Sequence, residues 1–249
     1  MEQFKVFRAI GLSFKAWFAN FIPFTILAGL VYAPTIYLMA TMPSLDSVSV
    51  SGMEAWVSKF QHATWALLAG STLLAPLLMH RVIHYMNGNK SSFGESVKHG
   101  VRGIIPAVIV AGVVTVVQMV PFGGIVGAVL TCYWFVTAPA AVVERLNPVA
   151  ALSRSNQLTQ GRRWGIFGLC ILLGLTNVIV MLVYLGPMLT GHVDSVEKAK
   201  TALEHFMYVF LSVAMVYQLF LGIVQAVSYS LLRADKDGVS NEELAKVFE

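Results

Sequence analysis

Long apolar runs alternate with short polar segments along almost the whole of this sequence. A helix needs about 20 mainly apolar residues to cross the roughly 30 Å hydrocarbon core of a bilayer. Helices are favoured there because they satisfy their own backbone polar groups. By this criterion the pattern predicts six membrane-spanning helices. Their expected ranges are 20–41, 61–84, 103–120, 124–143, 164–189 and 205–232.

The positive charges are distributed unevenly between the two sides that these spans define. Of the 17 Lys and Arg residues, all but three fall in the N-terminal segment, in the segments after the second and fourth spans, or in the C-terminal tail. The exceptions are Lys59, Lys198 and Lys200. Cytoplasmic loops of membrane proteins carry an excess of Lys and Arg. The distribution therefore predicts that the N- and C-termini both face the cytoplasm.

Three cytoplasmic segments carry helical patterns of their own. In residues 1–19, Phe7, Phe14 and Phe18 share one helical face with cations beside it, which predicts a helix lying in the membrane interface. Ser92 to Glu95 forms a capping box, and Asn147-Pro148 places an N-cap before a first-turn proline.

The predicted fold is thus an all-α integral membrane protein of six transmembrane helices in three hairpins. Each hairpin is preceded by a cytoplasmic interfacial amphipathic helix. A single transmembrane domain covers 1–232, and a cytoplasmic tail covers 233–249. The similarity of the hairpins indicates either true internal repeats or only their common topology.

Composition excludes several classes of protein. Of the 249 residues, 57% are hydrophobic and 12% charged, whereas soluble domains carry about 25% charged residues. Disordered chains, disulfide scaffolds and soluble enzymes are therefore excluded. The net charge of +4 indicates loop orientation and anionic lipid, not nucleic acid. Cys132 and Cys170 are interpreted as small hydrophobic residues, and His80 and His84 as interfacial residues, so no metal or cofactor is predicted.

Charged residues are absent from the middle of the predicted spans, although ion-coupled carriers and two-carboxylate hydrolases generally need them. We therefore expect no enzymatic activity. Uncharged polar side chains do occur there and form either a pocket for a small ligand or hydrogen bonds between helices, and the second interpretation is favoured. These residues are Gln118, Asn177, Gln218 and Gln225.

Cations lie beside apolar residues in all three cytoplasmic segments. Each cation near an anionic leaflet gains about 1 kcal/mol, so together they are predicted to contact lipid headgroups. The alternative is that they only enforce orientation during insertion. The predicted headgroup contacts are Lys5, Arg8, Lys15, Lys98, Arg102, Arg154, Arg162 and Arg163.

The segment 141–168 resembles a signature of YciC-like bacterial inner-membrane proteins and of the membrane domain found beside some glycerophosphodiester phosphodiesterases. This resemblance implies a protein of the bacterial inner membrane, and it brings no catalytic residues with it. The features that match are Glu144, Pro148, Ala151, Ser155, Leu158, Gly161, Trp164 and Phe167.

Three functions are compatible with these observations. The leading prediction is a non-enzymatic inner-membrane protein that contacts lipid and partner membrane proteins, or further copies of itself, in an assembly or envelope-maintenance role. The second is a permease or exporter of a small amphipathic or lipidic solute. The third and least favoured is an enzyme acting on a lipid.

Overall fold

A computed structural model describes residues 5–45, 52–86, 93–102, 104–118, 123–189 and 196–238. All regular secondary structure in these ranges is helical, which confirms the predicted all-α class. The helices are α1 (Val6–Ala19), α2 (Phe21–Val31), α3 (Ala33–Ala40), α4 (Met53–Met86), α5 (Phe93–Arg102), α6 (Ile104–Gln118), α7 (Gly123–Trp134), α8 (Thr137–Val143), α9 (Pro148–Thr159), α10 (Arg163–Leu189) and α11 (Val196–Asp237).

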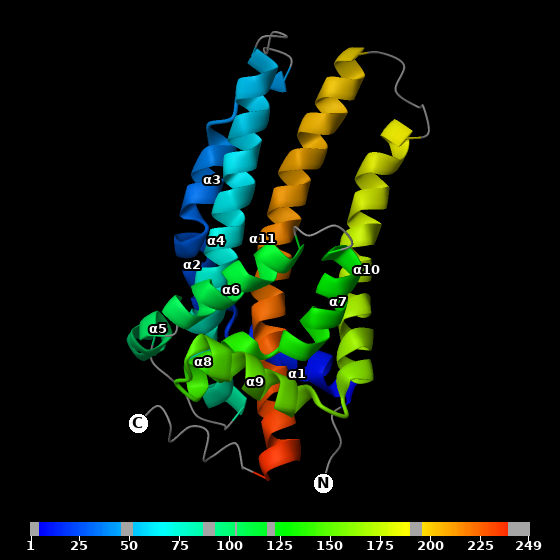
Figure 1. Cartoon of the computed structure of the whole chain (residues 1–249). Helices are drawn as coiled ribbons and strands as arrows, with labels where there is room; N and C mark the ends of the chain where they lie inside the picture. The colour runs from blue at the N-terminus through cyan, green and yellow to red at the C-terminus, as the bar shows by residue number, and fades with distance from the viewer. Residues whose placement is uncertain are drawn as a thin grey trace.

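The two longest helices, α4 and α11, pack along each other at the centre of the molecule (Figure 1). Helices α2 and α3 lie against α4, and α10 lies against α11. Helices α1, α5, α8 and α9 gather at the end of the molecule where α11 finishes, and Figure 1 shows the short α6–α7 pair rising from that end. We call it the α1 end.

Three helices, α4, α10 and α11, are long and apolar enough to cross a membrane, and the bent pair α1–α2 would make a fourth. The predicted first span 20–41 is divided into α2 and α3 at Tyr32. Helices α6 and α7 have 15 and 12 residues, so at 1.5 Å per residue each is shorter than the roughly 30 Å of hydrocarbon. Six spans in three hairpins therefore stay a prediction.

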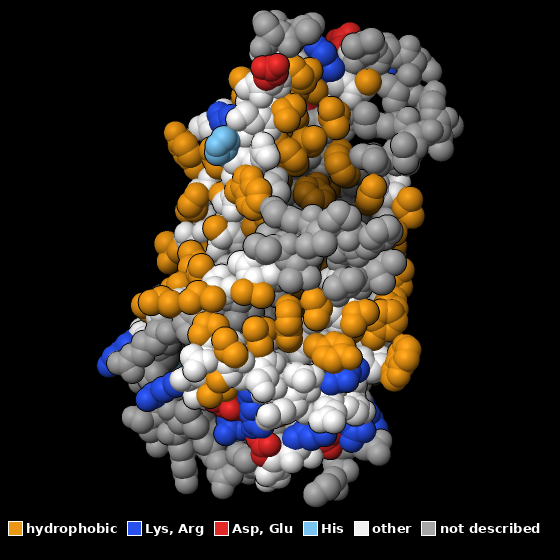
Figure 2. Space-filling model, in the orientation of Figure 1, with side chains coloured by type: hydrophobic (Ala, Val, Ile, Leu, Met, Phe, Trp, Pro, Cys, Tyr) orange, Lys and Arg blue, Asp and Glu red, His pale blue; other side chains and the backbone are white. Residues whose placement is uncertain are grey.

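The surface is that of a membrane protein. Figure 2 shows a broad band of hydrophobic side chains, with Lys, Arg, Asp and Glu concentrated toward the two ends. Much of the exposed apolar surface belongs to α2 and α10, where Ile22, Leu30 and Leu182 are each at least 60% exposed. Contiguous apolar surface of this kind is a liability in water, whereas lipid chains cover it at no cost.

Small residues allow the helices to approach closely. A methyl group added at Gly222 of α11 would lie 3.7 Å from the Cα of Ala75 in α4. One added at Gly70 of α4 would lie 2.8 Å from the Tyr32 ring, so this glycine makes room for the junction of α2 and α3. Around α11, one buried cluster joins it to α2–α4 and a second joins it to α7–α10.

Helix α1 turns into α2 through a bend of 85°. Asn20 occupies the corner, and its side-chain oxygen accepts a hydrogen bond of 2.8 Å from Arg81 Nε of α4. The buried face of α1 is a stripe of small residues, Ala9, Ser13 and Ala16, which packs against α11. Phe7 is 83% exposed on the outside of the helix. The predicted position of α1 among lipid headgroups stays a prediction.

Candidate functional site

A cleft of about 630 Å³ lies between α4, α6, the α7–α8 region and α11. We call it the polar cleft. Its walls are mostly apolar, with tryptophan rings contributed by α4 and α7. The polar side chains that line it are Ser71, Thr72, Thr131, Gln218 and Gln225.

The two glutamines differ from the hydroxyl groups of this cleft. Ser71 and Thr72 donate hydrogen bonds to the backbone oxygen of Leu68, and Thr131 donates to that of Gly127 at 2.7 Å, so each is satisfied within its own helix. Gln218 and Gln225 lie seven residues apart on one face of α11 and are half-buried. Neither amide has a hydrogen-bond partner within the described part of the chain.

Only two of the four predicted polar residues are placed together by the structure. Gln218 and Gln225 both line the polar cleft. Gln118 is the last residue of α6 and Asn177 lies within α10, but their side chains fall outside what the structure describes.

A second cleft, which we call the apolar groove, has a volume of about 740 Å³ and lies between α1, α10 and α11. Phe14 and Trp17 of α1 form one wall, and their rings pack on Phe220 at centroid distances of 4.6 and 5.4 Å. The Trp17 indole nitrogen is buried and has no hydrogen-bond partner among the described residues. The sequence pattern did not identify this buried donor.

At the α1 end, a network of ion pairs joins α8, α9 and α11. The Glu144 carboxylate accepts hydrogen bonds from Arg154 Nε at 2.9 Å and from Tyr229 Oη at 2.9 Å. Arg233 donates to the same Tyr229 oxygen at 3.1 Å, and Asp237 pairs with both Arg154 and Arg233. Burial lowers the pKa of Arg154, but its hydrogen bonds to Asp237 and Glu144 outweigh burial, so the net pKa is raised.

Three of the predicted lipid-headgroup contacts are instead occupied by interactions within the protein. Arg154 is paired with two carboxylates, and Arg162 Nε lies 3.0 Å from Asp235. Arg163 stacks 3.9 Å from the centroid of the Tyr133 ring. These three guanidinium groups interact with other side chains of the protein. Fewer of their N–H donors, and less of their positive charge, are therefore available to bind lipid headgroups. Among the other predicted headgroup contacts, Lys5, Arg8, Lys15 and Lys98 are exposed, while the side chain of Arg102 is outside the described residues.

The segment that carries the family resemblance builds a tight corner between α8 and α10. Asn147 caps α9 by accepting a hydrogen bond of 2.8 Å from the Ala150 amide, which confirms the predicted cap. Ser155 is buried and donates to the backbone oxygen of Tyr133 at 2.9 Å. Gly161 ends the corner with a φ of 82°, a conformation that glycine adopts without strain. Ser155 and Gly161, which are among the matched residues, therefore have structural roles here.

The two cysteines, which are far apart in sequence, meet in the structure. Cys132 of α7 is 6% exposed and belongs to a buried hydrophobic cluster against which Cys170 of α10 packs. The rings of His80 and His84 lie 4.4 Å apart on α4. Within the described residues, no group of three or more His, Cys, Asp or Glu side chains could hold a metal ion.

No protein-family model, curated protein or solved structure matches this chain. The resemblance to YciC-like proteins therefore stays a hypothesis that rests on the residues quoted for it.

Proposed function

We propose that this is a non-enzymatic membrane protein that binds anionic phospholipid through its N-terminal helix and contacts partner membrane proteins in an assembly or envelope-maintenance role. The observation that supports the proposal is the apolar groove with a buried, unpartnered indole N–H at its edge. A hydrogen-bond donor buried without a partner is costly, and a bound lipid can supply the missing acceptor.

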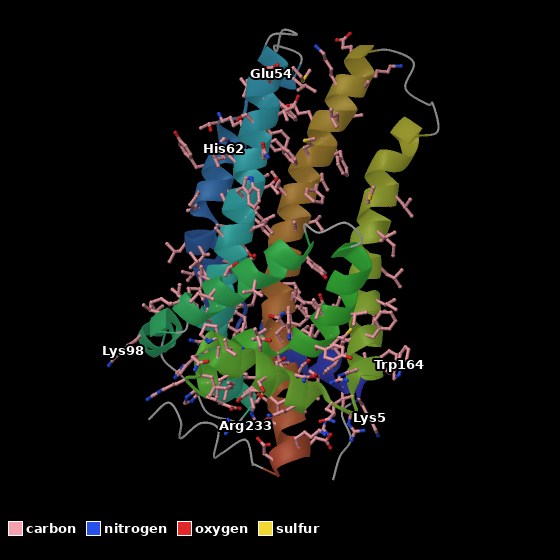
Figure 3. The ribbon with its side chains drawn as sticks, in the orientation of Figure 1. Lys5, Glu54, His62, Lys98, Trp164 and Arg233 are labelled. Atoms are coloured by element: carbon pink, nitrogen blue, oxygen red, sulfur yellow. The ribbon has the colours of Figure 1, made fainter. Side chains whose placement is uncertain are left out.

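The groove matches the three parts of a phospholipid. Its lining is almost entirely apolar, and each buried methylene group of an acyl chain gains about 0.8 kcal/mol. The Trp17 N–H is buried as the ring stands, and a small rotation of the ring into the groove would let it donate to an ester carbonyl, as tryptophans at membrane interfaces do. Lys5 and Lys15 are exposed on or beside the same helix and can meet the phosphate. Figure 3 shows Lys5 at the end that also carries Trp164 and Arg233.

Removing the indole donor while keeping an aromatic ring at this position tests the site. We expect Trp17→Phe to weaken retention of phosphatidylglycerol or cardiolipin about fivefold, because one hydrogen bond contributes about 1 kcal/mol. Native mass spectrometry of protein purified in mild detergent would measure the bound lipid. Trp164→Phe is the matched control, since Trp164 is 87% exposed at the same end. Equal lipid retention in the two variants would contradict the proposal.

We further propose that the protein lies in the bacterial inner membrane with six spans and both termini in the cytoplasm. The excess of Lys and Arg in the four predicted cytoplasmic segments supports this orientation. The family resemblance supports the inner membrane. The α1 end would then face the cytoplasm, and the junction of α10 and α11 would face outward.

Labelling of single cysteines in intact cells tests the orientation. In a Cys132→Ala/Cys170→Ala background, Thr201→Cys near the start of α11 should react with a membrane-impermeant maleimide. Ser153→Cys on α9 should react only after the membrane is opened. Both positions are exposed. Reaction of the α9 position from outside would reverse the proposed topology.

A permease remains the alternative function. It would use the polar cleft, because this cleft places hydrogen-bonding groups near the middle of α11. Solute-dependent flux into liposomes that carry the pure protein would favour this alternative.

A further inference from the structure

Among the described residues that line the polar cleft, none has an ionisable side chain. Its lining is contributed by apolar residues, glycine, Ser, Thr and the two glutamines. A charged group that enters a low-dielectric site without a counter-charge is strongly disfavoured. The lining therefore selects against an anionic headgroup, in contrast to the apolar groove with cations on and beside α1.

The glutamine amides give this cleft its hydrogen-bonding capacity. Each amide offers two N–H donors and a carbonyl acceptor, and neither Gln218 nor Gln225 has a partner in the described ranges. Buried polar groups in proteins are nearly always paired, so these half-buried amides have capacity for a further partner. Their Cα atoms lie about 10 Å apart along the helix axis. A ligand that reaches both is therefore elongated along α11.

Small residues create the space beside these amides. Ala107, Ala111 and Gly112 of α6 line the cleft together with Gly222 of α11. The volume of about 630 Å³ is within the usual range of sites for small organic ligands. Trp65 and Trp134 add aromatic walls, against which a flat or aliphatic body can pack.

We propose that the polar cleft binds an uncharged amphipathic lipid whose head bears hydroxyl or carbonyl groups that hydrogen-bond to Gln218 and Gln225. This site is independent of the phospholipid groove, and it stands whether or not the protein moves its ligand across the membrane. Two kinds of membrane molecule share this chemistry, namely diacylglycerols and isoprenoid quinones.

The binding experiment uses the full chain in phosphatidylcholine nanodiscs. The probes are dioctanoylglycerol and a short-chain alkyl quinone, and dioctanoyl phosphatidylglycerol is the charged comparator. Protection from thermal unfolding reports binding, because a ligand that binds only the folded state stabilises it. We expect at least one neutral probe to raise the unfolding temperature in a saturable way. The charged comparator should give no increase that depends on the residues of the cleft. Comparison of the two neutral probes shows whether the cleft binds a diacylglycerol or a quinone.

Two kinds of variant locate the site. Gln218→Leu and Gln225→Leu should each weaken binding of the neutral probe about fivefold, the effect of one hydrogen bond. Gly112→Leu should abolish binding by filling the cleft that Gly112 lines, where a Cβ meets nothing within 4 Å. Gly168→Leu is the control, because Gly168 is equally open but lies on α10, away from the cleft.

The stability of the ligand-free variants separates a binding role from a structural one. If the glutamines join helices, Gln218→Leu lowers the unfolding temperature without ligand. If they face a ligand, the variant is as stable as the parent, because an unpaired amide has been replaced by an apolar side chain. The proposal is overturned if no neutral probe protects the protein, if Gly112→Leu still binds, or if phosphatidylglycerol binds the cleft as strongly as the neutral probes.

Discussion

Replacing Glu144 by Gln is expected to lower the free energy of unfolding by about 2–3 kcal/mol. Loss of one partner from a buried ion pair costs about 3–5 kcal/mol. Here the side chains of Glu144, Arg154, Arg233 and Asp237 are 16–26% exposed, so solvent screens part of the effect. The change removes the carboxylate between two guanidinium groups, Arg154 Nε at 2.9 Å and Arg233 Nε at 3.9 Å. Asp237 alone would then face both.

Thermal unfolding in detergent micelles measures this loss. Glu54→Gln is the matched control, because Glu54 is exposed in the first turn of α4. Combining Glu144→Gln with Arg154→Met should recover part of the stability, since the second change removes one of the two like charges. A double-mutant cycle then gives the coupling energy of the pair. Strictly additive losses would show that the contact between α8 and α9 does not depend on this ion pair.

The long helices could be predicted because lipid imposes a simple rule on sequence. The predicted span 164–189 agrees closely with α10 (Arg163–Leu189). The predicted spans 61–84 and 205–232 lie inside α4 and α11, which continue beyond these spans on more polar residues. Backbone groups in lipid must bond within the segment, so a long apolar run leaves helix as the only choice.

The same rule could not predict the corner between α7 and α8. The apolar run 124–143 is compatible with one span, but the structure ends α7 at Trp134 and begins α8 at Thr137. Phe135, Val136 and Val143 are buried within the protein. Apolar side chains are equally stable against lipid and in a protein core, so hydropathy cannot distinguish the two environments.

Some features of the candidate sites could also be predicted from the sequence, and others could not. The seven-residue spacing of Gln218 and Gln225 predicts a shared helical face, and the structure places both in one cleft. The ion pair between Arg162 and Asp235 joins residues 73 positions apart in sequence. Pairing at such a distance depends on how α9 and α11 pack, for which no local pattern exists. The predicted set of headgroup contacts therefore included arginines that are paired with carboxylates inside the protein.

Replacing Gly100 by Ala should strongly destabilise the contact between α5 and α4. A Cβ at this position would lie 2.6 Å from the Cα and 2.7 Å from the Cδ2 of Leu77, so the backbone of one helix must shift. Overpacking of this kind costs up to about 3 kcal/mol. The higher helix propensity of Ala relative to Gly stabilises the helix by about 1 kcal/mol. The free energy of unfolding should therefore fall by about 2 kcal/mol.

Gly112→Ala on α6 is expected to increase the stability of the protein instead. A methyl group there meets nothing within 4 Å, so only the propensity term acts, and this variant should gain up to about 1 kcal/mol. Unfolding of both variants in the same detergent would give the difference directly. Because α5 also carries the exposed Lys98, a displaced α5 should change lipid retention together with stability. Equal stability of the two variants would mean that α5 does not pack on α4 at Leu77. The predicted contact between Lys98 and lipid headgroups would then lose its structural support.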